Sequence, residues 1–447
     1  MQALWLGSVL VLVVAMQVYL LLRGLRHSTH QLVLFEVYLS LALLTLGLAP
    51  ALWYLLETLV DAKQLFFQMK VSAPHYFAYA LPSLGALGLG LSRFKRPSST
   101  SDQELLQKVQ AQLQAEPYLP WLLMLGGFCL QLLQPYFLAN LRQVGHFGGM
   151  LLWIGTIHLL LAPIAARVKM SALGLVLLWL MYRSITSTFF GDLLFWPLLI
   201  ALYAQMYYQF SLRFLLGSGL GVLLGLLLIF SFKYEYRQRL WNDPNQGRYL
   251  QHLSEALQYR WQHPEGWYNV GQTFLTRINQ GKHLAMVYNW VPQHEPYARG
   301  ETLLSALPVV VVPRVIWPNK PQTGSLSQWY RFTGHQLGRG TSANFGICGE
   351  AYANLGIWLA LPFLLLWAWS LRAWYEYLRR LALSWYPCLW LWIPLIYCGL
   401  LDQENDFVTQ LNHGFKGTLF TLAMCWSLHK LSGYLPRNNP KLPLPRP

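Results

Sequence analysis

Four cationic residues in one stretch of the chain suggest that it binds an anion. Arg314, Lys320, Arg331 and Arg339 lie between positions 314 and 339, and no acidic residue occurs among them. A guanidinium group offers paired donors to phosphate oxygens, and a lysine adds a mobile positive charge. These residues therefore predict a diphosphate site. The alternative is that they contact lipid head groups or neighbouring acidic residues.

Arg183 is a fifth candidate, in the segment YRSITSTFFGD at the end of an apolar run. An arginine near membrane depth usually faces a cavity or an anion, because an unpaired charge in hydrocarbon is unfavourable. We therefore expect Arg183 to contact the same diphosphate. The alternative is an arginine that reaches outward to the membrane surface.

Two residues could accept a proton in such a site. His335 lies within the cationic stretch, and Glu350 is the first acidic residue after it, in GEAYANLG. Histidine exchanges protons readily near neutral pH, and a carboxylate can do so when its environment is suitable. Ordinary loop hydrogen bonds for His335, and a helix N-terminal charge for Glu350, are the alternatives. Asp402, Glu404 and Asp406 share one short loop, where a metal, a proton acceptor or simple topology could explain them.

The composition indicates a membrane protein. Of 447 residues, 55% are hydrophobic and only 11% are charged, whereas soluble domains are about 25% charged. The net charge of +15 resides mostly in loops, so binding of nucleic acid by a basic soluble domain is not expected. The five cysteines show no metal-binding spacing, and no nucleotide-binding or protease motif occurs. We therefore expect neither a metal nor a cofactor.

Apolar windows predict an all-α polytopic protein with about eleven transmembrane helices. The windows are 3–22, 32–57, 74–91, 119–139, 148–166, 170–183, 187–207, 213–232, 353–371, 383–401 and 415–433. Lysine and arginine are concentrated in alternate loops, which the positive-inside rule places in the cytoplasm. This pattern predicts an outer N-terminus and a cytoplasmic C-terminus.

The same topology divides the chain into four parts. Residues 1–232 hold eight spans and a cytoplasmic loop at 92–118, residues 233–352 form one large outer loop, residues 353–435 hold three spans, and residues 436–447 form a cytoplasmic tail. Helical spacing is expected over 102–116 and around 247–260. The apolar segment 303–312 is too short to span and suits a re-entrant or interfacial position.

This layout resembles the Wzy-type polymerases of O-antigen and exopolysaccharide repeat units. The segment PRVIWPNKP (313–321) is similar to their Pro-Arg, Trp-Pro and Lys-Pro pattern, and GEAYANLG (349–356) is similar to the stretch that follows it. The resemblance implies a GT-C-like membrane glycosyltransferase related to O-antigen ligases. Such an enzyme joins oligosaccharides carried on undecaprenyl diphosphate, at the periplasmic face of the bacterial inner membrane, without a metal.

The resemblance assigns roles to the residues described above. Arg183 and Arg314 would hold the diphosphate, with Arg331, Arg339 and Lys320 beside them, while His335 or Glu350 would act as the base. The aromatic side chains suited to stacking on sugar rings are Trp317, Trp329, Tyr330 and Tyr352. Membrane lipids, a chain-length regulator and a flippase are the implied partners. A ligase that transfers the glycan to another acceptor, and a transporter of polysaccharide or lipid-linked glycan, are the alternative functions.

Overall fold

The protein is helical throughout the part that can be described. The computed structural model describes residues 2–92, 100–137, 142–243, 248–263, 267–312, 316–317, 326–338 and 343–434. These ranges contain helices and no strands, as the sequence predicts. Six helices in them are long and apolar enough to cross a membrane: Leu4–His27, Leu34–Leu59, Arg142–Leu161, Ala166–Ser187, Leu212–Asn242 and Gly346–Ser384.

The helical elements follow one another with short connections. In chain order they are α1 (Gln2–His27), α2 (Leu34–Leu43), the π-helix η1 (Leu44–Leu48), α3 (Ala49–Leu59), the 3₁₀ turn η2 (Ala62–Gln64), α4 (Ala73–Leu91), α5 (Thr100–Ala115), α6 (Leu119–Leu133), η3 (Gln134–Tyr136), α7 (Arg142–Gly149), α8 (Leu151–Leu161), α9 (Ala166–Ser187), α10 (Asp192–Tyr208), α11 (Leu212–Asn242), α12 (Tyr249–Gln262), α13 (Trp267–Ile278), α14 (Gly281–Trp290), α15 (Glu301–Val311), α16 (Leu326–Thr333), α17 (Gly346–Ser384), η5 (Pro387–Trp392), α18 (Ile393–Leu401) and α19 (Phe407–Tyr434).

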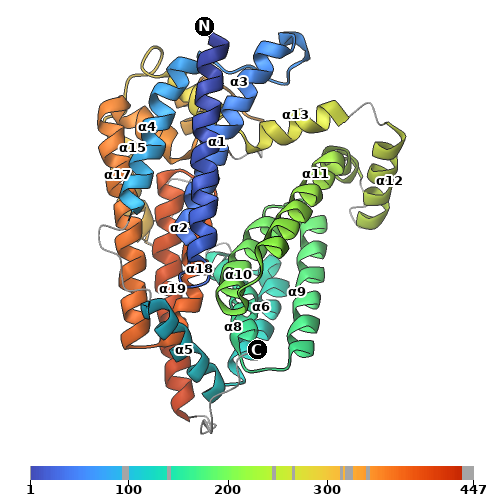
Figure 1. The fold of residues 1–447 in the computed structure, drawn as a ribbon, viewed down its shortest axis with the longest axis vertical. Coiled ribbons are helices and arrows are strands. Elements are labelled where there is room, and N and C mark those ends of the chain that lie inside the picture. Colours follow the sequence, from blue (N-terminus) through green and yellow to red (C-terminus); the bar gives the residue numbers. More distant parts are fainter. Residues whose placement is uncertain are drawn as a thin grey trace.

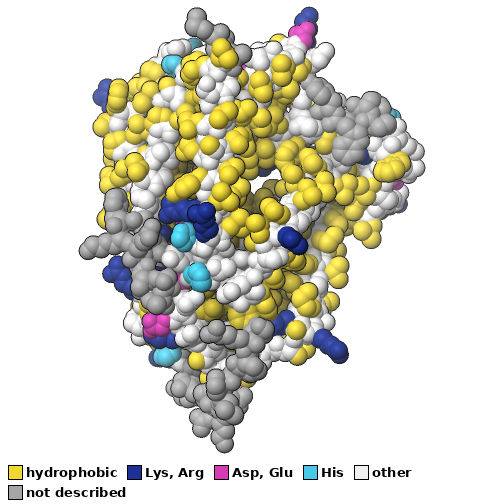
Figure 2. Space-filling view, in the orientation of Figure 1, with side chains coloured by type: hydrophobic (Ala, Val, Ile, Leu, Met, Phe, Trp, Pro, Cys, Tyr) yellow, Lys and Arg dark blue, Asp and Glu magenta, His cyan; other side chains and the backbone are white. Residues whose placement is uncertain are grey.

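The long helices form two groups that meet along η5 and α18 (Figure 1). One group contains α1 to α4, α17 and α19, with α4 packed along α17; the other contains α6, α8, α9 and α10. Gly90 of α4 and Gly127 of α6 lie directly against the backbones of α17 and α8, an approach that only a small residue permits. The surface is hollowed between α1 and α11, below α13 (Figure 2).

Each of the eleven predicted windows overlaps helical residues, and six of them lie on the helices that are long and apolar enough to cross a membrane. Several helices extend beyond their windows. Helix α11 continues to Asn242 because Phe232, Tyr236 and Leu240 keep helical spacing and are buried against Ala256 of α12. Helix α17 begins at Gly346, before the predicted start at 353. The loop predicted over 233–352 is therefore shorter than expected, and its described residues include the helices α12 to α16.

Helix α5 (Thr100–Ala115) covers most of the predicted segment 102–116 and lies at the end of the molecule where α19 ends (Figure 1). It is docked on α17 through Asp102, which is 2% exposed and accepts a 2.8 Å hydrogen bond from Arg379 Nη1. Leu105, Val109 and Leu113 on the same face are fully buried. An ion pair and an apolar stripe together fix this helix against the membrane helices.

A π-helical turn at η1 fixes the start of α14. The wider turn frees backbone carbonyls from the regular helical pattern. The N–H of Gln280 donates to Thr45 O at 3.1 Å, and the hydroxyl of Tyr76 donates to Leu46 O at 2.7 Å. Helix α14, which follows Gln280, is thereby attached to the first group of helices.

Helix α17 changes direction at Gly356, whose φ of 65° and ψ of −176° lie outside the helical region. Only glycine adopts this conformation without strain. The ring of Tyr297 also lies so close that an added Cβ would approach it to 3.2 Å. The kink separates a short buried helix, Gly346 to Leu355, from the long membrane helix that follows.

Candidate functional site

Four basic side chains from three helices gather at the end of the molecule where α13 lies. We call Lys233 and Arg237 of α11, Arg277 of α13 and Lys282 of α14 the basic cluster. Arg277 is close enough to repel each of the other three. Helix α13 lies across this end, from α3 to α11 (Figure 1). It is held by Gln272, which donates to Gln64 O and accepts from Phe66 N.

Aromatic rings line the two cluster residues on α11. Lys233 Nζ lies 5.5 Å from the ring centre of Phe190 and 5.3 Å from that of Phe230. The Arg237 guanidinium lies 5.8 Å from the ring centre of Phe189. Among the described residues, neither cation has an ion-pair partner. Rings provide a weakly attractive surface for a cation but do not neutralise it, so these charges stay available to an anion.

The cluster makes its surroundings strongly positive. Burial, together with the charge of Arg277, lowers the pKa of Lys282 to about 8, and Glu404 opposes this effect. Burial also lowers the pKa of the adjacent His283 to about 3, with contributions from Lys282 and Arg277. Burial is the larger cause of both shifts, and the positive charges of Arg277 and Lys282 add to it. A bound anion would offset these positive charges.

Two acidic side chains only partly offset the cluster. Arg277 Nη1 lies 3.1 Å from Glu404 Oε1, and the Gln280 amide also donates to this carboxylate. Burial, and then the charge of Glu404, raise the pKa of Asp402. Glu404 is held in place because its carbonyl accepts a hydrogen bond from Gly346 N at 3.1 Å. Four cations thus face two carboxylates, so a net positive charge remains.

Arg183 lies on the last turns of α9, close to α11. The hydroxyl of Tyr236 donates to Ile185 O at 2.8 Å, and Arg237 Nη2 donates to Thr188 O at 2.7 Å. These bonds satisfy carbonyls that the end of a helix leaves free. Arg237 contacts Thr188, which is five residues after Arg183. Arg183 therefore lies about one and a half helical turns before this contact. These contacts join the end of α9, the helix that carries Arg183, to the helix that carries Lys233 and Arg237.

The predicted base Glu350 has a structural role. Its side chain is fully buried, with 0% exposure. One carboxylate oxygen accepts from Thr302 Oγ1 at 2.7 Å and the other from Phe407 N, at the start of α19, at 2.6 Å. Asn354 completes the network, since its amide donates to Thr302 Oγ1 at 2.8 Å. These contacts give Glu350 a structural role, since both carboxylate oxygens accept hydrogen bonds away from solvent; its role as a base stays a prediction.

Two of the four predicted sugar-stacking aromatics are buried in the protein core. Trp329 is 3% exposed and packs edge-on against His283. Tyr352 is 3% exposed, and its hydroxyl donates to Val291 O at 3.2 Å. Neither ring has a face available to a sugar, which corrects that prediction. Tyr330 is 51% exposed, and Trp317 is partly buried, so their rings remain accessible.

The cationic stretch itself is less uniform than its sequence suggests. Arg331 lies 2.6 Å from Glu295 and 3.0 Å from Glu301, and hydrogen bonds to Glu301 and then to Glu295 raise its pKa. A guanidinium held by two carboxylates has no spare charge for a diphosphate, so this prediction is corrected. His335 is exposed, and its backbone N–H donates to Thr333 Oγ1. The other predicted cations, Arg314, Lys320 and Arg339, lie outside the described residues.

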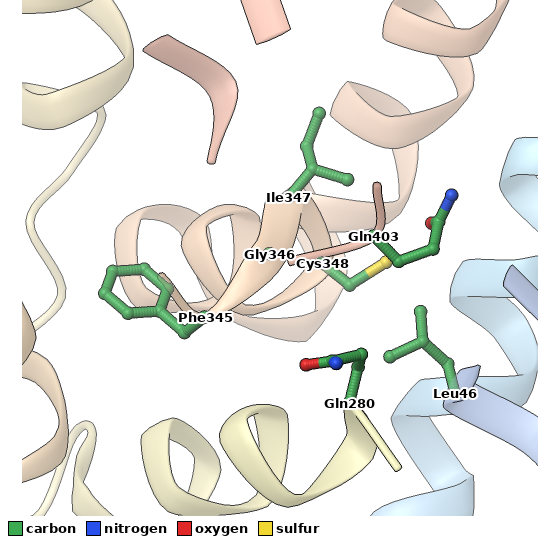
Figure 3. A pocket seen from close by; sticks show the side chains of 7 residues that line it. All are labelled: Leu46, Gln280, Phe345, Gly346, Ile347, Cys348 and Gln403. Carbon is green, nitrogen blue, oxygen red and sulfur yellow. The ribbon is translucent and has the colours of Figure 1, made fainter. Parts of the chain in front are cut away.

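A small cavity lies beside the cluster, at the N-terminus of α17 (Figure 3). It is lined by Leu46, Gln280, Phe345, Gly346, Ile347, Cys348 and Gln403. Its volume of about 10 Å³ matches one water molecule and not a sugar or a lipid head group. The buried Gln280 Oε1, which has no hydrogen-bond partner among the described residues, suits such a water. This cavity therefore belongs to the scaffold of the site.

The basic cluster is the part of the site that the sequence predictions missed. A signal for it was present, because Lys233 and Arg237 lie at the outer end of the eighth predicted span, where cations are normally scarce. Arg183 was selected for a similar reason, because it is a cation at the end of an apolar run. Arg277 and Lys282 are ordinary loop residues in the sequence, and only the fold brings them to α11.

Comparison with known proteins yields one match. A family model described as a domain of unknown function, DUF8712, matches residues 103–401. This range includes Arg183 and the whole basic cluster. No curated protein matches the chain, and no solved structure matches it.

Proposed function

The chain belongs to the DUF8712 family, a domain of unknown function, and we propose from its own residues that it is a membrane glycosyltransferase. In this proposal it joins oligosaccharide repeat units carried on undecaprenyl diphosphate into a polysaccharide. The reaction takes place at the outer face of the bacterial inner membrane. The diphosphate-linked sugar supplies the energy, so the proposal needs neither a metal nor a nucleotide.

The basic cluster is the observation that carries this proposal. In the proposed topology Lys233 and Arg237 lie in the outer part of the apolar helix α11, where the diphosphate of a membrane-anchored lipid would lie. Three of the four cations, Lys233, Arg237 and Lys282, have no ion-pair partner among the described residues, and Lys282 is held at a reduced pKa. A ligand with two or more negative charges is the natural partner for such a site. Arg183, a turn and a half from Thr188, would extend it toward the reacting sugar.

The arrangement of helices supports the corresponding topology. We propose eleven membrane passes, a periplasmic N-terminus, a cytoplasmic C-terminus and a GT-C-like organisation. In Figure 1 the N-terminus and α13 lie at one end, and α5 and the last turns of α19 lie at the other. This arrangement is the one that the distribution of loop lysines and arginines requires. The hollow between α1 and α11 (Figure 2) would let a lipid-linked substrate approach from the side.

In the proposed reaction the cluster acts on the leaving group. As the bond between the sugar and the diphosphate breaks, negative charge grows on the diphosphate oxygens. Arg237 and Lys282, already positioned by the fold, would stabilise this charge more strongly in the transition state than in the bound substrate. Preorganised charge of this kind is commonly worth several kcal/mol, or about 10²–10³ in rate for each donor.

Deletion and complementation in the native host test the proposal. The deletion strain should accumulate single lipid-linked repeats and lose polymer, and the wild-type gene should restore polymer. The variant Arg237→Gln should restore little polymer, whereas Arg239→Gln should restore it. Arg239 is a matched control because it lies on the same helix but pairs with Glu255 at 3.2 Å.

Other accumulated species would contradict the proposal and indicate a different function. Full-length lipid-linked polymer would indicate a ligase. Repeats retained on the cytoplasmic face would indicate a transporter. Polymer made normally by the Arg237→Gln variant would refute the role of the cluster.

A further inference from the structure

Helix α12 turns three large apolar side chains outward on one face. Leu250 is 75% exposed, Leu257 is 38% exposed and Trp261 is 89% exposed. At about 100° of rotation per residue, the three positions fall within about 40° of one another around the helix axis. Aligned and exposed apolar side chains of this kind mark an interaction surface. We call Leu250, Leu257 and Trp261 the apolar stripe.

The charged side chains of α12 and its one histidine bond to α11 or to the residue that caps it. Arg260 Nε donates to Ser231 O at 3.0 Å, and Glu255 Oε2 lies 3.2 Å from Arg239 Nη1. The Nε2 atom of His252 lies 2.7 Å from the carboxylate of the C-cap residue of α11. These bonds fix α12 along the last turns of α11. They also leave the apolar stripe without a charge, which suits apolar surroundings.

The part of α11 that α12 contacts lies where a membrane-spanning α11 leaves the hydrocarbon. About 20 residues cross that layer, so a span that begins at Leu212 reaches its other side near Ser231. Up to Leu228 the large exposed side chains of α11 are mostly leucines, and beyond it they are Tyr234 and Trp241. Tyrosine and tryptophan are enriched where a membrane meets water. Helix α12 therefore lies beside α11 at this interfacial depth.

A membrane surface suits the apolar stripe better than another protein does. Figure 1 shows α12 at the edge of the molecule, beside the far end of α11 and away from both groups of helices. A stable protein interface takes about 20–30 residues from each side, whereas the stripe has three. A helix that lies in the surface of a membrane needs only one face of leucine and tryptophan, buried among the head groups. The stripe also continues the exposed surface of α11, which is itself long and apolar enough to cross a membrane.

We propose that α12 is an interfacial anchor, with its apolar stripe buried among the phospholipid head groups and the first acyl carbons beside the end of α11. This anchor is a property of the protein in its membrane and does not depend on the proposed reaction. It has a consequence for the basic cluster, because Arg260 of α12 bonds to Ser231, two residues before Lys233. The anchor thereby sets the depth at which Lys233 and Arg237 meet the lipid surface.

Spin labels on the full-length protein test this anchor, in vesicles of phosphatidylethanolamine and phosphatidylglycerol. Cys129→Ser removes an exposed native cysteine, and this protein without an added cysteine is the blank. Leu257→Cys, Trp261→Cys or Gln258→Cys then adds one labelling position. Gln258 is the matched control, because it is exposed beside Leu257 but lies outside the stripe. The ratio of collisions with oxygen to collisions with a water-soluble nickel chelate should be several times higher at positions 257 and 261 than at 258.

Equal ratios at the three positions would show that the stripe faces water, and the anchor would be overturned. Low access to both reagents, with spin–spin broadening between molecules, would show that a second copy covers the stripe, and this result would overturn it as well. If Trp261→Cys yields little folded protein, Leu250→Cys reports on the same stripe from the first turn of α12. The labels detect the membrane and not polymer formation, so a failure of the proposed function would leave their result unchanged.

Discussion

Substituting Lys282 by methionine should make the protein more stable while weakening its binding of lipid diphosphate. Methionine keeps the length of the side chain and removes the charge. In the folded protein, burial and the charge of Arg277 lower the pKa of Lys282 from 10.5 to about 8. The charge of Lys282 therefore lowers the free energy of unfolding, and removing this charge should raise it.

The magnitude and its pH dependence follow from linkage. A fall in pKa from 10.5 to about 8 corresponds to about 3 kcal/mol of lost stability, since each pH unit is worth about 1.4 kcal/mol. This loss is complete below pH 8, declines as pH rises, and vanishes above the unfolded-state pKa near 10.5. The substitution also removes a 3.1 Å hydrogen bond to Thr276 O, worth about 1 kcal/mol. A net gain of about 2 kcal/mol is expected at pH 7.

Thermal unfolding of the full-length protein in detergent measures this effect. The midpoint should rise by a few degrees for Lys282→Met at pH 7, and the gain should shrink toward pH 10.5. Undecaprenyl diphosphate should raise the wild-type midpoint more than that of the variant. Lys63→Met is the control, because Lys63 is an exposed lysine in η2 outside the cluster. A variant that is less stable at pH 7, or a gain that does not depend on pH, would refute the reasoning.

Three further substitutions separate structural from functional roles. Glu350→Gln should lower the free energy of unfolding by about 1–3 kcal/mol, because the glutamine side chain has only one oxygen that can accept a hydrogen bond. Unchanged stability with lost activity would instead favour a catalytic role. Asp102→Asn should weaken the docking of α5 by about 3 kcal/mol, because it leaves the charge of Arg379 without this carboxylate. Limited proteolysis near residue 100 should then become faster. Equal cleavage rates for the variant and the wild type would show that the ion pair is dispensable. Trp329→Ala should lower the free energy of unfolding by about 3–5 kcal/mol, because Trp329 is buried. Tyr330→Ala should leave the free energy of unfolding nearly unchanged, because Tyr330 is exposed. Equal unfolding midpoints for the two variants would contradict this difference in burial.

The helical class was predictable from the sequence because the signal of an apolar run is local. Apolar runs must reach about 20 residues to cross a membrane, and six of the eleven predicted windows lie on described helices that are long and apolar enough to do so. The ends of α11 and α17 were misplaced because their outer turns are polar. Tyr236 of α11 and Glu350 of α17 are buried by partners elsewhere in the chain, which hydropathy cannot report.

The candidate site was harder to predict because it depends on contacts between distant residues. Lys233 and Lys282 both lie near Arg277 because α14 is bonded to η1 and α13 packs against α11. The segment containing Glu350 and Tyr352 looked like a site because polar and aromatic residues precede a membrane helix. The fold uses it to join α15, α17 and α19. The role of Arg183 as a diphosphate contact stays a prediction; the described contacts show only that the end of α9 bonds to α11.

The most direct test of the account is a structure of the full-length protein with undecaprenyl diphosphate bound. The account predicts that the diphosphate lies within hydrogen-bonding distance of Arg237 or Lys282, at the outer end of α11. Its first sugar-bearing oxygen should point toward Arg183. A diphosphate bound elsewhere, with the basic cluster in contact only with Glu404 and water, would contradict the central claim.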